Sequence, residues 1–172
     1  MFKNDSIALE NIPKYEEVSF TALHKDYVKI VRMNMLLTFL IGLSVSCVIF
    51  FTIDEVEKYY IIAGILFLTL LLGWFPLVAY KKKKYAFRQH DVLYTSGLIF
   101  KSTHIIPYIR LQHVVIKQGW YAKRLGLATL QLHTAANDNV DVSIPGLTLE
   151  DAERWKSFLL NRLQELDDDT AQ

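Results

Sequence analysis

Two long uncharged runs dominate the hydrophobic pattern of the chain. The first covers residues 33–53 and the second covers residues 59–80. Because a helix rises about 1.5 Å per residue, the first run spans about 31 Å, close to the roughly 30 Å hydrocarbon core of a bilayer. Residues 54–58, which are mainly acidic, join the two runs. The pattern predicts two transmembrane helices that form a hairpin.

The basic residues around this hairpin predict its orientation. Lys25, Lys29 and Arg32 precede the first run, and four consecutive lysines follow the second. Since Lys and Arg favour the cytoplasmic side of a membrane, we expect both termini to be cytoplasmic. The four lysines are interpreted first as a topological stop and second as a contact with anionic lipid. The residues expected at this lipid surface are Lys81, Lys82, Lys83, Lys84 and Arg88.

The first run also carries a stripe of small residues. Thr38, Gly42 and Ser46 are spaced four apart, which places them on one face of a helix. Small residues let two helices approach closely, so the stripe predicts helix packing, either within the hairpin or against a partner helix. Neither run contains Asp, Glu, Lys, Arg or His, which argues against a transporter or pump.

From residue 85 the pattern changes to short segments rich in β-branched and aromatic residues, which predicts an antiparallel meander. In residues 111–116 the apolar side chains cannot all share one face, so we expect a bulge or a two-sided strand there. The expected inward set of the next strand is Leu127, Leu130 and Leu132. The predicted strands cover residues 85–89, 92–97, 98–107, 109–119, 127–134 and 140–146.

A helix from about residue 149 to residue 166 closes this pattern. Thr148 is the expected N-cap, with Asp151 three residues later as an acidic variant of the capping box. Apolar residues recur at steps of three and four, which predicts a face that docks on the sheet. These residues are Ala152, Trp155, Leu159, Leu163 and Leu166.

Strands followed by one amphipathic helix are typical of the pleckstrin-homology (PH) architecture. The run "RLQHVVIKQGWYAKRLGLATLQLHTA", followed by "SIPGLTLEDAERWKSFLL", resembles the bacterial PH-domain family that includes the YdbS-like membrane proteins. In that group two transmembrane helices precede one such domain. The chain departs from the pattern at residues 136–139, where "ANDN" replaces a tight glycine turn and predicts a longer hairpin.

The resemblance implies a membrane-anchored α+β protein of a bacterial inner membrane. Its fold would be a two-helix hairpin and a PH-like antiparallel barrel or bent sheet, capped by the C-terminal helix. The expected divisions are an N-terminal segment (1–32), two helices (33–53 and 59–80) with a loop (54–58), a basic tether (81–84), the PH-like domain (85–166) and an acidic tail (167–172).

Composition agrees with a membrane protein and excludes some functions. Hydrophobic residues form 52% of the chain, and mean hydropathy is +0.19. A formal net charge of +1 argues against nucleic-acid binding, which needs a larger basic excess. The lone Cys47 is interpreted as a small apolar filler, because it lacks the neighbours of a zinc site.

No constellation of residues predicts an enzyme. The chain lacks a phosphate-binding loop, HExxH, Gly-x-Ser-x-Gly and CxxC, so we expect neither catalysis nor a cofactor. His104, His113 and His133 lie in predicted strands, and they are interpreted as ordinary hydrogen-bonding positions rather than as metal ligands. The PH resemblance suggests headgroup binding in residues 88–92, but Asp91 opposes Arg88 there.

A second candidate surface lies on the predicted strand at residues 109–119 and on the loop expected after it at residues 120–124. Aromatic residues alternate with cations there, as in protein interfaces and at anionic lipid. Its members are Arg110, Gln112, Lys117, Trp120, Tyr121, Lys123 and Arg124. The preferred hypothesis is a non-enzymatic docking or scaffold module that contacts membrane lipids and a related PH-domain membrane protein. The alternative is a module that senses anionic lipid.

Overall fold

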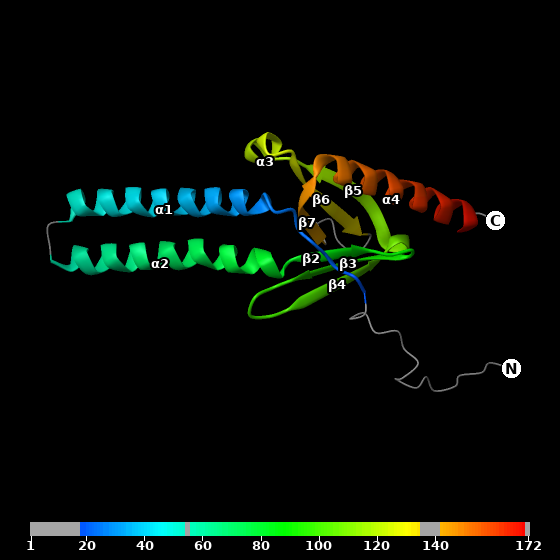
Figure 1. Cartoon of the computed structure of the whole chain (residues 1–172). Coiled ribbons are helices and arrows are strands. Elements are labelled where there is room, and N and C mark those ends of the chain that lie inside the picture. The colour runs from blue at the N-terminus through cyan, green and yellow to red at the C-terminus, as the bar shows by residue number, and fades with distance from the viewer. Residues whose placement is uncertain (1–17, 54–55, 135–141, 171–172) are drawn as a thin grey trace, which may run out of the picture.

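Two antiparallel helices extend from one end of a small α+β domain (Figure 1). The computed structural model describes residues 18–53, 56–134 and 142–170, with side chains to residue 165. The helices are α1 (Tyr27–Thr52) and α2 (Glu57–Ala79). Among the described residues these two helices are long and apolar enough to cross a membrane. In the most apolar 18-residue stretch of each helix, only 11% (α1) and 6% (α2) is buried within the protein.

Both helices begin earlier than the uncharged runs. Helix α1 continues back through Arg32 and Lys29 to Tyr27, and α2 begins at Glu57 inside the expected loop. Charged residues limit the part of each helix that can lie in lipid. They do not end the helix itself, because their side chains can reach water from the first turns. Residues 54–55 lie outside the described residues.

The small-residue stripe packs within the hairpin. Gly42 and Ser46 are buried in α1, and a Cβ at Gly42 would collide with Thr69 of α2. A reciprocal contact occurs nearer the domain, where a Cβ at Gly73 of α2 would lie 2.9 Å from Cγ of Met35. Glycine on each helix thus admits a side chain from the other. Ser46 donates its hydroxyl proton back to the carbonyl of Gly42 at 2.8 Å.

The domain contains two antiparallel sheets that do not close into a barrel. One has the order β1-β2-β3-β4 and the other the order β5-β6-β7. Three short helices connect these elements: η3 (Tyr80–Lys82), η4 (Tyr108–Arg110) and α3 (Trp120–Arg124). The strands are β1 (Thr21–Ala22), β2 (Lys84–Phe87), β3 (Asp91–Ser96), β4 (Ser102–Pro107), β5 (Leu111–Lys117), β6 (Leu127–Thr134) and β7 (Val142–Thr148).

Three local predictions were wrong. Residues 98–101 belong to a turn rather than to the strand predicted for residues 98–107, which begins only at Ser102. Residues 120–124 form the helix α3 rather than a loop. The C-terminal helix runs through Thr170, so most of the expected acidic tail is helical. The turn expected at residues 136–139 lies outside the described residues.

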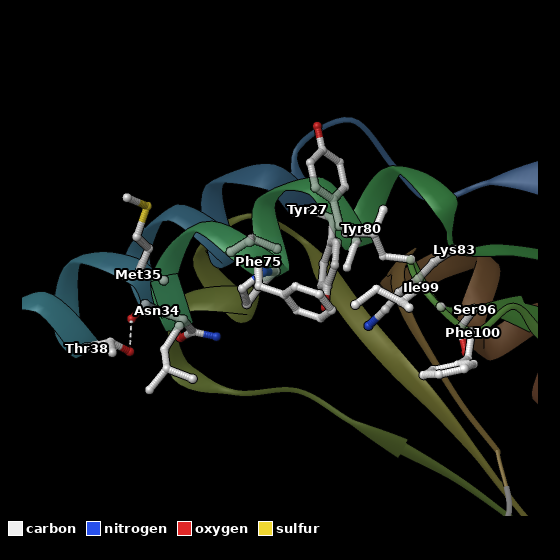
Figure 2. Close-up of a pocket in the computed structure, with 17 residues that line it drawn as sticks. Tyr27, Asn34, Met35, Thr38, Phe75, Tyr80, Lys83, Ser96, Ile99 and Phe100 are labelled. Atoms are coloured by element: carbon white, nitrogen blue, oxygen red, sulfur yellow. Dashed lines mark hydrogen bonds between the residues drawn. The ribbon is translucent and has the colours of Figure 1, made fainter. Parts of the chain in front are cut away.

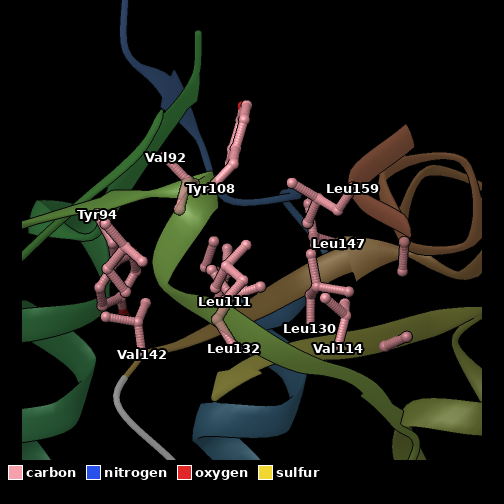
Figure 3. Packing of buried hydrophobic residues seen from close by; sticks show 14 residues of the cluster. Val92, Tyr94, Tyr108, Leu111, Val114, Leu130, Leu132, Val142, Leu147 and Leu159 are labelled. Atoms are coloured by element: carbon pink, nitrogen blue, oxygen red, sulfur yellow. The ribbon is translucent and has the colours of Figure 1, made fainter. Parts of the chain in front are cut away.

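The domain core lies between the two sheets and the C-terminal helix α4 (Leu149–Thr170) (Figure 3). The predicted inward residues Leu127, Leu130 and Leu132 are at most 1% exposed. The expected irregularity in β5 occurs as a shift of register between Leu111 and His113, which lets both Leu111 and Val114 point inward. Thus a bulge resolves the mismatch in that strand.

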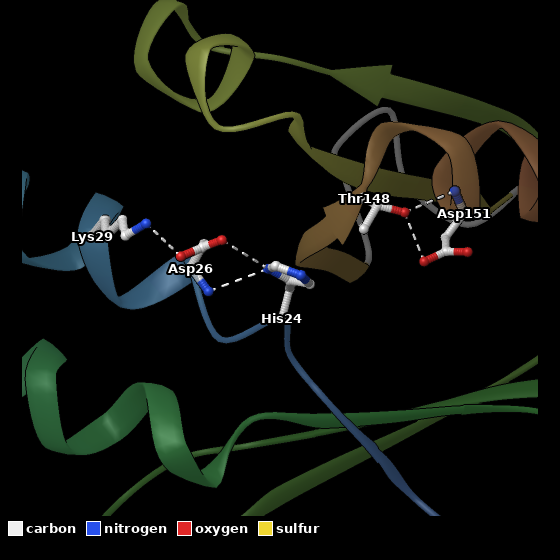
Figure 4. A network of polar contacts seen from close by, with 5 residues as sticks. All are labelled: His24, Asp26, Lys29, Thr148 and Asp151. Carbon is white, nitrogen blue, oxygen red and sulfur yellow. Dashed lines mark hydrogen bonds and ion pairs between the residues drawn. The ribbon is translucent and has the colours of Figure 1, made fainter.

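Helix α4 docks through the predicted apolar face. Ala152 and Leu159 are fully buried, and the Trp155 ring stacks on Phe87 of β2 with centroids 3.9 Å apart. At its start, Thr148 Oγ accepts the backbone N–H of Asp151 at 3.0 Å and donates to the Asp151 carboxylate at 2.7 Å (Figure 4). The N-cap prediction is confirmed. The side chain of Leu166 lies outside the described residues.

Residues before the hairpin also belong to the domain. Strand β1 pairs with β2, with Thr21 opposite Tyr85. The His24 backbone N–H donates to the carbonyl of Gly146 at 2.9 Å, and a Cβ at Gly146 would lie 2.9 Å from Tyr27. Asp26 joins His24 and Lys29 where α1 begins (Figure 4). The division at residue 85 is therefore too late, because the chain contacts the domain on entering and on leaving the hairpin.

Candidate membrane-proximal functional site

Two turns flank β3, and they lie at opposite ends of the domain. The β2–β3 turn (residues 88–90) points away from the hairpin, whereas the β3–β4 turn (residues 97–101) reaches back along α2 (Figure 1). Only Lys83 separates η3 from β2, so the domain lies close to the end of α2. Of the two turns, the β3–β4 turn is therefore the one beside the membrane-spanning helices.

The β3–β4 turn carries a large apolar tip. Ile99 and Phe100 are 73% and 87% exposed. Gly97 fixes the shape of the turn, because its φ of +108° is rarely open to other residues and a Cβ there would collide with the backbone carbonyl of Phe100. The glycine thus holds the two apolar side chains at the tip.

An apolar cleft separates this turn from the hairpin. Its volume is about 530 Å³, and Figure 2 shows side chains from α1, α2 and the turn around it. Phe75 and Pro76 line it from α2, Val31 and Met35 line it from α1, and Ile99 and Phe100 line it from the turn. These residues supply a wall that is continuous with the lipid-facing helices.

Lysines surround the turn. Lys83 is partly buried and lines the apolar cleft, and burial lowers the pKa of its amino group. A second cleft of about 450 Å³ is lined by Lys82, Lys84 and Lys101, and it shares Gly97 and Leu98 with the first. No acidic residue lines either cleft, and none of these lysines forms an ion pair with another residue in the described ranges. Of the predicted basic residues, Lys82, Lys83 and Lys84 line these clefts together with Lys101, which sequence reasoning missed, whereas Lys81 lines neither cleft.

At the β2–β3 turn, the positive charge of Arg88 is paired with the nearby carboxylate of Asp91. Arg88 Nε donates to Asp91 Oδ1 at 2.6 Å, and Arg88 Nη2 donates to Asp91 Oδ2. This bidentate pairing raises the pKa of the Arg88 guanidinium. The Tyr108 hydroxyl donates to the carbonyl of Arg88 at 2.6 Å. Arg88 is therefore separate from the four lysines, and the opposition of Arg88 and Asp91 expected from the sequence is present.

The residues of the second candidate surface divide into two groups. Trp120 of α3 is 68% exposed, its ring lies 5.4 Å from that of Tyr121, and Lys123 and Arg124 are exposed beside it. Lys117 ends β5 just before this helix. In Figure 1, α3 lies at the hairpin end of the domain, near the start of α1. This group therefore faces the same end as the β3–β4 turn.

Arg110 and Gln112 lie instead at the corner between β4 and β5. Among the described residues, β4 pairs only with β3 and β5 only with β6, so each has one unpaired edge. Arg110 lines a hollow of about 320 Å³ together with Ile105 and Thr134. Ile105 of β4, Ile109 of η4 and Val115 of β5 are 48%, 67% and 37% exposed. The corner therefore exposes both backbone and apolar side chains.

The three strand histidines do not form one cluster. His113 and His133 are paired across β5 and β6, whereas His104 lies in the other sheet and contacts Ser102 Oγ at 3.0 Å. Within the described ranges no group of three potential metal ligands comes together.

Comparisons with known proteins agree with this architecture. The family model described as "Bacterial PH domain" matches residues 37–165. The chain is 31% identical over 138 residues to the UPF0699 transmembrane protein YdbS of Bacillus subtilis (strain 168), a match that covers 74% of this chain and 85% of that protein. No solved structure matches the chain.

Proposed function

Because the chain belongs to the bacterial PH domain family and carries two transmembrane helices, we propose that it docks another membrane protein at the cytoplasmic face of a bacterial inner membrane. In this proposal both termini are cytoplasmic, as the basic flanks of the hairpin favour. The protein is a non-enzymatic scaffold, and its partner is a related membrane protein with PH domains.

The observation that carries this proposal is the corner between β4 and β5, where each strand has an edge that pairs with no other described strand. Soluble proteins usually cover, shorten or charge their sheet edges, because unpaired N–H and C=O groups attract other strands. Here the corner instead places Ile105 and Ile109 beside the edges, with Arg110 and Gln112 next to them. An extended segment of a partner would pair with the strand backbone and cover these side chains.

The attachment of the domain restricts which partners it reaches. The chain passes from α2 through η3 and Lys83 directly into β2, and β1 fixes the segment before α1 to the same sheet. The domain therefore cannot swing far from the bilayer. A partner anchored in the same membrane meets the corner at a constant height, which favours it over a soluble protein.

Mild-detergent purification from native membranes tests the docking proposal. We expect a related PH-domain membrane protein to co-purify with the wild type and to be lost from the double variant Ile105→Ser, Ile109→Ser, as measured by quantitative mass spectrometry. The matched control is Ile99→Ser, Phe100→Ser, which removes apolar area from the β3–β4 turn and should retain the partner. Repeated purification without a specific companion, or equal recovery from all three proteins, would contradict the proposal.

A further inference from the structure

We propose that the cleft between the hairpin and the β3–β4 turn binds one anionic glycerophospholipid, with an acyl chain against Phe75 and Ile99 and the phosphate beside Lys83. This site is distinct from the open corner and does not depend on the docking proposal. Residues 97–101 would act as a wedge whose tip enters the membrane interface.

The position of the turn supports this inference. It reaches back along the end of α2 (Figure 1). The uncharged segment of α2 ends there, and we place the membrane surface at that level. Apolar surface is unfavourable in water, so the exposure of Ile99 and Phe100 has a cost in solution. At the depth of the last turn of α2, the same side chains contact lipid instead.

The shape of the cleft favours an occupant with a long apolar part. A volume of about 530 Å³ lies within the roughly 300–1,000 Å³ typical of ligand sites. Leu72 and Thr38 extend the lining into the segments that face hydrocarbon. A ligand can therefore lie parallel to the helices with its tail in the bilayer, which an inorganic phosphate or a polar peptide does not do.

The charge around the cleft favours an anionic headgroup. Lys83 approaches the cleft from the tether, near Ile99 (Figure 2). Lys82, Lys84 and Lys101 line the adjoining cleft across Gly97 and Leu98. Because no described residue of either lining is acidic, a phosphate placed here meets lysines that these linings do not neutralise. Asn34 lines the same cleft and supplies an amide for a glycerol or ester oxygen.

Native mass spectrometry of the full chain tests the lipid site directly. The protein would be released from nanodiscs that contain equal amounts of phosphatidylglycerol and phosphatidylcholine. We expect the wild type to retain phosphatidylglycerol preferentially, and Lys83→Gln to lower the retained fraction about fivefold, the effect of one basic contact. The control Lys156→Gln removes a lysine from α4 and should change nothing. Millimolar inorganic phosphate should not displace the lipid.

Three outcomes of that measurement would overturn the lipid site. The first is equal retention of the two lipids by the wild type, and the second is the same retention of phosphatidylglycerol by the Lys83→Gln and Lys156→Gln variants. Displacement by inorganic phosphate would assign the lysines to a free anion instead and would also overturn it.

Spin labels test whether the tip enters the membrane. In a Cys47→Ser background, Ile99→Cys and Ile109→Cys place labels at two positions of similar exposure, 73% and 67%. In nanodiscs we expect the label at position 99 to collide mainly with oxygen, which partitions into lipid, and the label at position 109 mainly with a water-soluble nickel chelate. Equal accessibility of both labels to the chelate would contradict the insertion of the turn. Both variants keep Lys83, so this measurement reports the depth of the tip and not the contact between the lysine and the headgroup.

Discussion

The two turns of strand β3 differ in charge, in apolar exposure and in position. At the β2–β3 turn, Arg88 and Asp91 form an ion pair with each other, and the turn points away from the hairpin. The β3–β4 turn has lysines nearby that pair with no acid among the described residues, and it has a tip of two exposed apolar residues beside α2. In a membrane-tethered domain, the attachment decides which turn meets lipid. The loop that the PH resemblance suggests for headgroup binding is at the wrong end of this domain.

The largest expected effect comes from changing the turn that lies beside the membrane. Gly97→Ala forces a side chain into positive φ and against the Phe100 carbonyl, so we expect a loss of about 3 kcal/mol in unfolding free energy. The control is Gly119→Ala, where a Cβ meets nothing within 4 Å and the effect should be near zero. Chemical denaturation of the detergent-solubilised protein measures both. A Gly97→Ala variant as stable as the control would show that the turn adapts and is not held in its shape by Gly97.

Much of the fold was predictable because the bilayer and the domain core each require a particular pattern of apolar residues in the sequence. The bilayer requires long uncharged helices, and both helices contain the predicted runs except for Ile53 and Tyr80, the C-cap residues of α1 and α2. The core requires an inward face, and Leu127, Leu130 and Leu132 supply it. Thr148 caps α4 through a contact between residues three apart. Each of these features depends on neighbouring residues and is therefore visible in the sequence.

The features that sequence reasoning missed depend on contacts between distant segments. Strand β1 has two residues, and its partner β2 lies beyond the whole hairpin, so no local signal marks it. Ile99 and Phe100 resemble strand residues in the sequence, but they lie in a turn whose surroundings are set by α2. Lys101 lies near Lys82 and Lys84 only because the pairing of β3 with β4 brings the β3–β4 turn close to the tether. The pair Ser96-Gly97, where the turn begins, was a local signal of a turn.

A smaller effect is expected from the turn that points away from the membrane. Asp91 is 19% exposed in its side chain, and its pairing with Arg88 is bidentate. Asp91→Asn removes the charge but keeps the shape, and we expect a loss of about 1.5 kcal/mol in unfolding free energy. A double-mutant cycle with Arg88→Gln measures the coupling between the two side chains.

The same variants also test whether the two turns differ in their contact with lipid. Neither substitution should alter the retention of phosphatidylglycerol, because the pair lies far from the cleft of the other turn. If Asp91→Asn instead increased lipid retention by freeing Arg88, the β2–β3 turn would also contact the membrane, and the contrast between the turns would fail.

The smallest expected effect concerns Tyr108, whose hydroxyl supports the β2–β3 turn. The side chain is 2% exposed, and burial raises the pKa of Tyr108 to about 12. An unfolded tyrosine has a pKa of about 10, so the folded state favours the neutral phenol. Its contribution is complete below about pH 10 and is lost as the pH rises towards 12, because the unfolded chain then releases the proton more readily. Burial likewise raises the pKa of Tyr94 to about 12, so part of this alkaline loss persists without Tyr108.

Tyr108→Phe separates the hydrogen bond from the titration. At pH 8 the variant loses the bond to the Arg88 carbonyl, and we expect unfolding free energy to fall by about 1 kcal/mol. Between pH 10 and pH 12 its stability should fall less steeply than that of the wild type, because one raised pKa is gone. Denaturation at pH 8, 10 and 11 measures both effects, with Tyr121→Phe on α3 as the control. If stability fell equally steeply with pH in Tyr108→Phe and in the wild type, ionisation of the Tyr108 phenol would not contribute to the loss of stability at alkaline pH.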